Sequence, residues 1–152
     1  MRLTRALTAL AVSATLALTA AALAGCGPDT GPRVVLKTAH SSAGTVVVDA
    51  AGRAVYLYSG DQQNAKSTSC DAACRASWPP VTTISTQPKG DGVDAAVGEI
   101  PAPDGGYQVT LDGWPLYYFD GDTTAGMIKG QGIGNVWWLL APDGQKITAI
   151  GR

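Results

Sequence analysis

Two cysteines carry the most reactive side chains of this sequence, in the segment Cys70-Asp-Ala-Ala-Cys74. In a helical turn, this spacing puts both sulfurs on one face, close enough for a disulfide or a shared metal ion. A cysteine pair in an oxidising compartment favours a structural disulfide. Because so short a loop gains only about 2 kcal/mol from closure, a redox-active pair is the alternative.

Copper is the metal that these thiols would suit. Cu(I) prefers soft ligands, and His40 or Met127 could complete a site with the two sulfurs. The spacing is similar to that of membrane-anchored copper chaperones, but those have a thioredoxin-like fold, and no βαβ pattern is present here. The sequence therefore predicts no cofactor, with copper as the alternative and the metal ligands left open.

Two aspartates, Asp61 and Asp122, each follow a glycine at the exit of a predicted strand. An aspartate there readily accepts hydrogen bonds from backbone N–H groups two residues on, which fixes a turn. The segment DGD (120–122) would also begin a calcium loop or supply paired carboxylates for hydrolysis. The further calcium ligands are missing, and no nucleophile or phosphate-loop motif accompanies the carboxylates. We therefore predict that the protein is not an enzyme.

Aromatic residues gather in two similar segments, AVYLYSGD (54–61) and WPLYYFDGD (114–122). Alternate residues of a strand share a face, so Tyr56 points with Tyr58, and Tyr117 points with Phe119. Both faces of each strand are apolar, which predicts central strands whose aromatics pair in a core. The alternative is an exposed platform for a flat ligand, formed by Trp78, Trp114, Trp137 and Trp138.

The two segments belong to two copies of one unit, about residues 44–84 and 105–141. Short β-rich runs separated by Gly, Pro and Asp predict an all-β fold, in which two related hairpin-based repeats pack as one small domain over residues 34–152. Asp-Gly pairs favour tight hairpins. Turns are predicted at 49–53, 112–113 and 143–144, one helical turn within 67–78, and strands near 34–39, 45–49, 54–59, 81–84, 107–111, 115–119, 136–141 and 146–150.

A Tyr-x-aromatic-x-x-Asp motif is present in each copy, formed by Tyr56, Tyr58 and Asp61 and by Tyr117, Phe119 and Asp122. This motif resembles the repeat of predicted bacterial lipoproteins described as a secreted repeat of unknown function. The segments CDAACRASWPP and VWWLLAPDG also resemble that family, and the likeness extends over roughly residues 44–145. It implies an exported, usually lipid-anchored protein and no particular activity.

The N-terminus has the pattern of a secretory signal, with the basic segment MRLTR followed by an uncharged apolar run. The segment LAGC (23–26) resembles the lipobox of bacterial lipoproteins. That resemblance implies removal of a signal peptide (1–25) and lipid on Cys26, so that residues 26–33 form a flexible tether. We expect an exported protein that lipid anchors to the outer face of the plasma membrane or cell envelope.

The charge of the chain argues against nucleic acid, because its formal net charge is −1 and it has no basic stripe. The favoured hypothesis is a non-enzymatic binding or interaction module whose partner is an envelope protein or a cell-surface component. The alternative is a redox or copper-handling, electron-transfer-associated lipoprotein that uses Cys70 and Cys74.

Overall fold

The computed structural model describes residues 31–66 and 68–148. The predicted signal peptide, the lipidation at Cys26 and most of the tether lie outside these residues. The elements in chain order are β1 (Arg33–Ser41), β2 (Gly44–Asp49), β3 (Tyr56–Tyr58), α1 (Ala72–Ser77), β4 (Thr82–Thr83), β5 (Pro88–Asp91), β6 (Val97–Pro101), β7 (Tyr107–Leu111), β8 (Trp114–Tyr117), the 3-10 helix η1 (Ile133–Asn135) and β9 (Trp137–Leu139). Strands dominate, as the sequence predicts.

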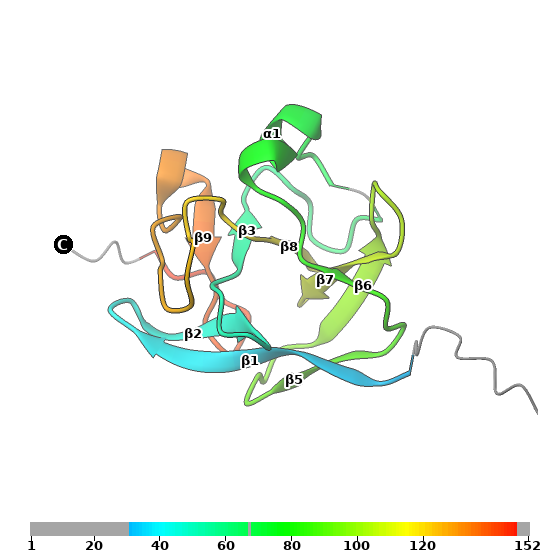
Figure 1. Cartoon of the computed structure of the whole chain (residues 1–152), viewed down its shortest axis with the longest axis horizontal. Helices are drawn as coiled ribbons and strands as arrows, with labels where there is room; N and C mark the ends of the chain where they lie inside the picture. The colour runs from blue at the N-terminus through cyan, green and yellow to red at the C-terminus, as the bar shows by residue number, and fades with distance from the viewer. Residues whose placement is uncertain (1–30, 67, 149–152) are drawn as a thin grey trace, which may run out of the picture.

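The strands form two sheets. The smaller has the order β2-β1-β5, in which β1 pairs antiparallel with β2 and parallel with β5. The larger has the order β4-β7-β8-β3-β9, and β6 adds to β7. In Figure 1 the smaller sheet lies along the bottom and α1 at the top, with β3, β7 and β8 between them.

Strand β3 is central in the larger sheet, between β8 and β9. Its side chains alternate between two buried clusters, because successive residues of a strand point to opposite faces. Tyr56 belongs to one cluster and Leu57 to the other, and Leu116 and Tyr117 of β8 divide in the same way. The predicted alternation of these two strands is therefore confirmed.

The two clusters differ in composition. One is mostly aliphatic and includes Leu36, Val47, Val55, Leu57, Val81, Val109, Leu111, Leu116, Trp138 and Leu140. The other is rich in rings and includes Val46, Val48, Ala54, Tyr56, Cys70, Trp78, Tyr117, Trp137 and Leu139. We call the second the aromatic cluster.

Two of the three predicted hairpins differ from expectation. The turn at Asp112-Gly113 joins β7 to β8 with both residues at positive φ, as predicted. The chain also turns at 49–53, but a single bridge joins Val48 to Ala54, and β3 then leaves for the other sheet. The reason is that β8 and β9 of the second repeat occupy both edges of β3. After the turn at 143–144, a bridge joins Leu140 to Lys146, and the described part of the predicted strand, residues 146–148, forms no strand.

The connection over residues 85–106 contains two strands that the sequence did not predict. The segment PKGD forms β5 although Pro, Gly and Asp are poor strand formers, because it pairs alongside β1. β6 pairs with all of β7. The helical turn predicted before Trp78 is confirmed as α1, where the carboxylate of Asp71 caps the N-terminus by accepting from Cys74 N.

Candidate functional site

The motif tyrosines and aspartates pair between the two repeats. The Tyr56 hydroxyl donates to Asp122 Oδ2 at 2.5 Å, and the Tyr117 hydroxyl donates to Asp61 Oδ2 at 2.6 Å. Tyr56 and Tyr117 are also direct partners in the β3–β8 ladder. Each copy thus supplies the tyrosine for the aspartate of the other, and we call these the crossed pairs.

The remaining oxygen of each motif aspartate binds the loop that follows it. Asp61 Oδ1 accepts from Ser69 N, and Asp122 Oδ1 accepts from Lys129 N. The expected hydrogen bonds to N–H groups two residues on are therefore not the ones that form, because the carboxylates point inward to the crossed tyrosines. Asp122 is buried and Asp120 is exposed, which separates the two carboxylates considered for hydrolysis.

Burial controls the ionisation of the crossed pairs. The pKa of Tyr56 is raised above the usual value near 10, first by desolvation and then by the hydrogen bond to Asp122. The pKa of Tyr117 is raised in the same way, with Asp61 as its partner. Both phenols therefore keep their protons at any ordinary pH.

Four rings form a continuous column beside the crossed pairs. Trp78 and Trp137 stack in parallel, with centroids 3.8 Å apart and planes at 3°. Phe119 packs on the outer face of Trp78, and Tyr58 packs on the outer face of Trp137, each at 4.5 Å. The column therefore follows the same internal symmetry as the crossed pairs, with its centre between the two indoles.

The motif tyrosines meet the column edge-on. The ring of Tyr56 is 5.5 Å from Trp78, and that of Tyr117 is 5.3 Å from Trp137, at interplanar angles of 80° and 86°. Edge-to-face contact is one of the geometries that aromatic pairs prefer, so these contacts stabilise the cluster. The spacing also needs Gly130, because a Cβ there would lie 2.8 Å from Tyr56 and 2.9 Å from Trp78.

The four tryptophans do not form the exposed platform considered from the sequence. Trp78 and Trp137 are buried with their faces covered by other rings. Trp138 is buried in the aliphatic cluster, and Trp114 is half-buried against it. Alternation along β9 explains the division, since neighbouring residues Trp137 and Trp138 point to opposite faces.

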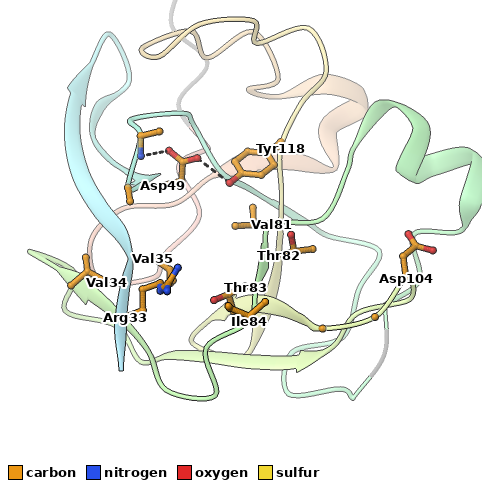
Figure 2. A pocket seen from close by; sticks show the side chains of 14 residues that line it. Arg33, Val34, Val35, Asp49, Val81, Thr82, Thr83, Ile84, Asp104 and Tyr118 are labelled. Atoms are coloured by element: carbon orange, nitrogen blue, oxygen red, sulfur yellow. Dashed lines mark hydrogen bonds between the residues drawn. The ribbon is translucent and has the colours of Figure 1, made fainter. Parts of the chain in front are cut away.

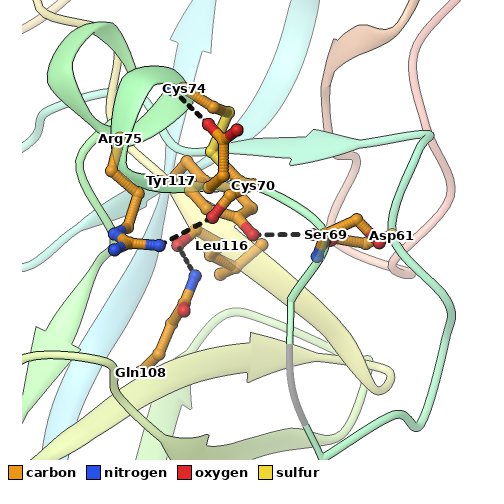
Figure 3. The surroundings of a disulfide bond; sticks show 9 residues. Asp61, Ser69, Cys70, Cys74, Arg75, Gln108, Leu116 and Tyr117 are labelled. Atoms are coloured by element: carbon orange, nitrogen blue, oxygen red, sulfur yellow. Dashed lines mark hydrogen bonds between the residues drawn. A yellow bond between two sulfur atoms is a disulfide. The ribbon is translucent and has the colours of Figure 1, made fainter.

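Cys70 and Cys74 form a disulfide that closes the first turn of α1 (Figure 3). Cys70 is buried within the aromatic cluster, and its carbonyl oxygen accepts from the Arg75 guanidinium at 2.8 Å. Cys74 is half-buried and lines a hollow of about 330 Å³ with Tyr58, Trp78 and Trp137. The predicted disulfide is confirmed, and one of its sulfurs lies beside the ring column.

The two cysteines and His40, considered as copper ligands, are not gathered into one site. In the part of the chain that the structure describes, no three His, Cys, Asp or Glu side chains are grouped to hold a metal ion. His40 lies on β1, 3.3 Å from the Thr45 hydroxyl. Since both sulfurs form the disulfide, they would have to be reduced before binding a metal as thiolates.

A groove of about 730 Å³ opens on the other side of the molecule, over the aliphatic cluster (Figure 2). Tyr118 lies in it and donates to Asp49 Oδ2 at 2.9 Å, while the Arg53 guanidinium lies 4.1 Å above the Tyr118 ring. Burial and the nearby Asp49 carboxylate raise the pKa of Tyr118. The groove is lined by residues 33–35, 49–51, 81–84 and 104–106 and by Tyr118.

Two exposed aliphatic side chains distinguish this groove. Val34 is 51% exposed and Ile84 is 46% exposed, and both line it. Asp49 stabilises one wall, since its Oδ1 accepts from the backbone N–H groups of Ala51 and Arg53. The sequence does not reveal this site, because five separate segments contribute to it and each has the pattern of an ordinary strand or turn.

Comparison with known proteins places the chain in a family. The family described as "secreted repeat of unknown function" matches residues 37–82 and 99–141, together more than half of the chain. The chain belongs to this family. The two matched repeats correspond to the two copies whose tyrosines and aspartates cross. No curated protein and no solved structure is significantly similar to the chain.

Membership of the secreted repeat family supports export, and it leaves the biochemical role open. Within residues 31–66 and 68–148, no helix has the length and apolar character to cross a membrane. The two candidates for a functional site among the described residues are the aromatic cluster with its disulfide and the groove.

Proposed function

We propose that the protein is a non-enzymatic binding module, anchored to the cell envelope by lipid on Cys26, whose groove binds an extended segment of a partner envelope protein. The observation that carries the proposal is the pair of exposed aliphatic side chains, Val34 and Ile84, in one groove. Isolated apolar residues on a surface are ordinary, but two that line the same concavity are typical of a binding site.

The ends of the groove carry opposite charges. Arg33 lies toward one end and Asp104 at the other, with Ile84 between them, and Val34 lies beyond Arg33 on the other side of β1 (Figure 2). Gly105 and Gly106 have no side chains, so a foreign backbone can approach there closely. An extended peptide with an acidic residue at one end, apolar residues in the middle and a basic residue at the other end would match this surface.

The position of the groove also suits a partner at the membrane. β1 begins at Arg33, and the seven residues from Cys26 to Pro32 reach at most about 25 Å when fully extended. Lipid on Cys26 would therefore hold this end of the domain near the bilayer, within reach of other membrane-attached proteins.

Site-specific photo-crosslinking tests the proposal. A photoreactive residue in place of Ile84 should capture one envelope protein in intact cells. The same residue in place of Ile133, which is 39% exposed on η1, is the matched control and should not capture it. Mass spectrometry of the adduct would give the contacted segment, which is then synthesised as a peptide.

The peptide must then bind through the groove. Val34→Asp with Ile84→Asp should weaken its binding at least about tenfold, since each substitution puts a charge in an apolar contact. Ile133→Asp should leave binding unchanged, and Arg33→Glu should weaken it for peptides with an acidic end. The proposal would be overturned if the double variant bound the peptide as tightly as the wild-type protein. It would also be overturned if position 133 captured the same protein equally well, or if position 84 captured only polysaccharide.

A second candidate function uses the disulfide, because Cys74 faces a hollow that an external thiol can enter. Replacing both Cys70 and Cys74 by serine should cost about 2 kcal/mol of stability from the lost loop closure. In the redox hypothesis the double variant also loses its activity with a thiol oxidoreductase. If the variant only loses stability and still binds the groove peptide, the disulfide is structural.

A further inference from the structure

The aromatic cluster combines two features that together support one-electron chemistry. The first is the parallel contact of Trp78 and Trp137 at 3.8 Å. A tryptophan that loses an electron carries a positive charge over its ring, and a ring face stacked against it stabilises that charge as it would any cation. The covering rings Phe119 and Tyr58 extend this stabilisation on both sides.

The second feature is a proton acceptor already bound to each neighbouring tyrosine. An oxidised phenol is strongly acidic, so a tyrosine loses an electron readily only if its proton has somewhere to go. Asp122 and Asp61 accept the hydroxyl protons of Tyr56 and Tyr117 in hydrogen bonds of 2.5 and 2.6 Å. Both carboxylates are nearly buried, which strengthens their interaction with a positive charge nearby.

We propose that the crossed pairs and the Trp78–Trp137 stack form a radical-relay site. An oxygen-centred radical at the surface, RO•, takes one electron from the stack and becomes ROH with a proton from solvent. Tyr56 or Tyr117 then gives one electron to the oxidised stack and its hydroxyl proton to Asp122 or Asp61. The products are a neutral tyrosyl radical, a protonated aspartate and a restored tryptophan pair. A thiol donor, RSH, at the surface then returns one electron to the tyrosyl radical through the stack, releases its proton to solvent and becomes RS•, while the aspartate returns its proton to the tyrosyl oxygen.

The oxidant has a route to the stack. The hollow lined by Tyr58, Cys74, Trp78 and Trp137 opens to solvent, and Tyr58 is half-buried at that end of the column. The electron therefore leaves through the stacked rings toward the surface, whereas the two crossed tyrosines, fully buried, are shielded from direct attack. The raised pKa of both phenols keeps them protonated, so proton and electron must leave together.

The molecule contains a matched internal control in Tyr118 and Asp49. This pair has the same hydrogen bond, at 2.9 Å, but Tyr118 packs on the aliphatic cluster across the sheet from the stack. The Arg53 guanidinium, 4.1 Å above its ring, disfavours a second positive charge there. Tyr118 therefore should not collect the radical.

Photo-oxidation of the full chain in detergent tests the relay, with photogenerated tris(bipyridine)ruthenium(III) as the one-electron oxidant. Electron paramagnetic resonance should detect a tyrosyl radical in the wild-type protein. Tyr56→Phe or Tyr117→Phe alone should roughly halve its yield, and the two together should abolish it. Tyr118→Phe should leave the yield unchanged.

The aspartates have their own readout. Asp61→Asn with Asp122→Asn keeps a side chain of the same shape that still accepts a hydrogen bond, but an amide does not take the proton. The radical should then remain on tryptophan, with a tryptophanyl in place of a tyrosyl spectrum. Near-ultraviolet circular dichroism verifies that each variant retains its fold. If a double variant does not fold, the two single variants are measured in its place.

Two results would overturn the relay. One is a tyrosyl yield that survives loss of both Tyr56 and Tyr117, and the other is a tyrosyl spectrum unchanged in the double asparagine variant. The relay is independent of the binding function proposed above, because none of its residues lines the groove. Loss of peptide binding and loss of the radical signal are therefore separate outcomes.

Discussion

Tyrosine–aspartate hydrogen bonds occur in two regions of this molecule, and the regions differ in symmetry. In the aromatic cluster the bond is made twice, by Tyr56 with Asp122 and by Tyr117 with Asp61. At the groove it is made once, by Tyr118 with Asp49. When the repeats are aligned on Tyr56 and Tyr117, the counterpart of Tyr118 is Leu57, which has no hydroxyl.

This difference distinguishes contacts that belong to the repeat itself from contacts that are particular to this chain. A contact present in both copies stabilises the packing of one repeat on the other, so any chemistry at the crossed pairs would be shared by proteins built from two such repeats. A contact present in one copy breaks the symmetry. The groove, with Tyr118, Val34 and Ile84, is therefore the region where a function particular to this chain is best sought.

The largest expected effect is the loss of a stacked indole. Trp137→Ala should lower the free energy of unfolding by about 3–5 kcal/mol, because it removes a buried ring that packs between Trp78 and Tyr58. Trp114→Ala, in a half-buried residue at the edge of the aliphatic cluster, should cost clearly less. Chemical denaturation followed by circular dichroism measures both. An equal loss of stability in both variants would mean that the stacked indoles do not stabilise the fold more than a peripheral tryptophan does.

The second largest effect is expected at alkaline pH, where deprotonation of the crossed tyrosines should lower the stability of the fold. The pKa values of Tyr56 and Tyr117 are raised above 10 in the folded state, so their contribution is complete below pH 10 and is lost as the pH rises further. At pH 11 the two together should lower the free energy of unfolding by about 3 kcal/mol. Tyr117→Phe should make the decline shallower by about 1.4 kcal/mol per pH unit, and Tyr118→Phe should do the same, because its pKa is raised as well. A decline unaffected by Tyr117→Phe would contradict the assignment.

The crossing itself predicts a pattern of coupling. Asp122→Ala should cost about 2 kcal/mol, since it leaves the buried Tyr56 hydroxyl without its acceptor. In double-mutant cycles, Tyr56→Phe should couple to Asp122→Ala by about 1 kcal/mol or more and to Asp61→Ala by nearly nothing. Coupling between Tyr56 and Asp61 instead would show that each motif closes on itself and that the repeats do not cross.

Sequence reasoning identified the strands of the aromatic cluster well, because their signals are local. Alternation of side chains predicted the faces of β3 and β8, and the repeat predicted that their aromatics pair. The crossing did not follow from these signals. Within a copy, the spacing from Tyr56 to Asp61 is the same whichever tyrosine the carboxylate finally binds. Only the placement of β3 between two strands of the other repeat decides it.

The groove was beyond local reasoning for a different reason. Val34 and Ile84 come from segments whose sequences are those of ordinary strands. Their exposure depends on where β2 ends and where residues 104–106 turn. The strand β5 is a similar case, because PKGD forms a strand through its pairing with β1 and against its own propensities. Features made by contacts between distant segments leave little trace in any one of them.

The smallest expected effect returns to the unsymmetrical pair. Tyr118→Phe should cost about 0.5–1 kcal/mol, because Asp49 keeps its bonds to Ala51 and Arg53 and the half-buried site admits water. Tyr56→Phe should cost more, since Asp122 would keep a buried oxygen without its donor. Thermal or chemical unfolding of the two variants gives the comparison directly. If Tyr118→Phe instead matches Tyr56→Phe in stability but leaves peptide binding intact, Tyr118 belongs to the scaffold, and the groove must depend on Val34 and Ile84 alone.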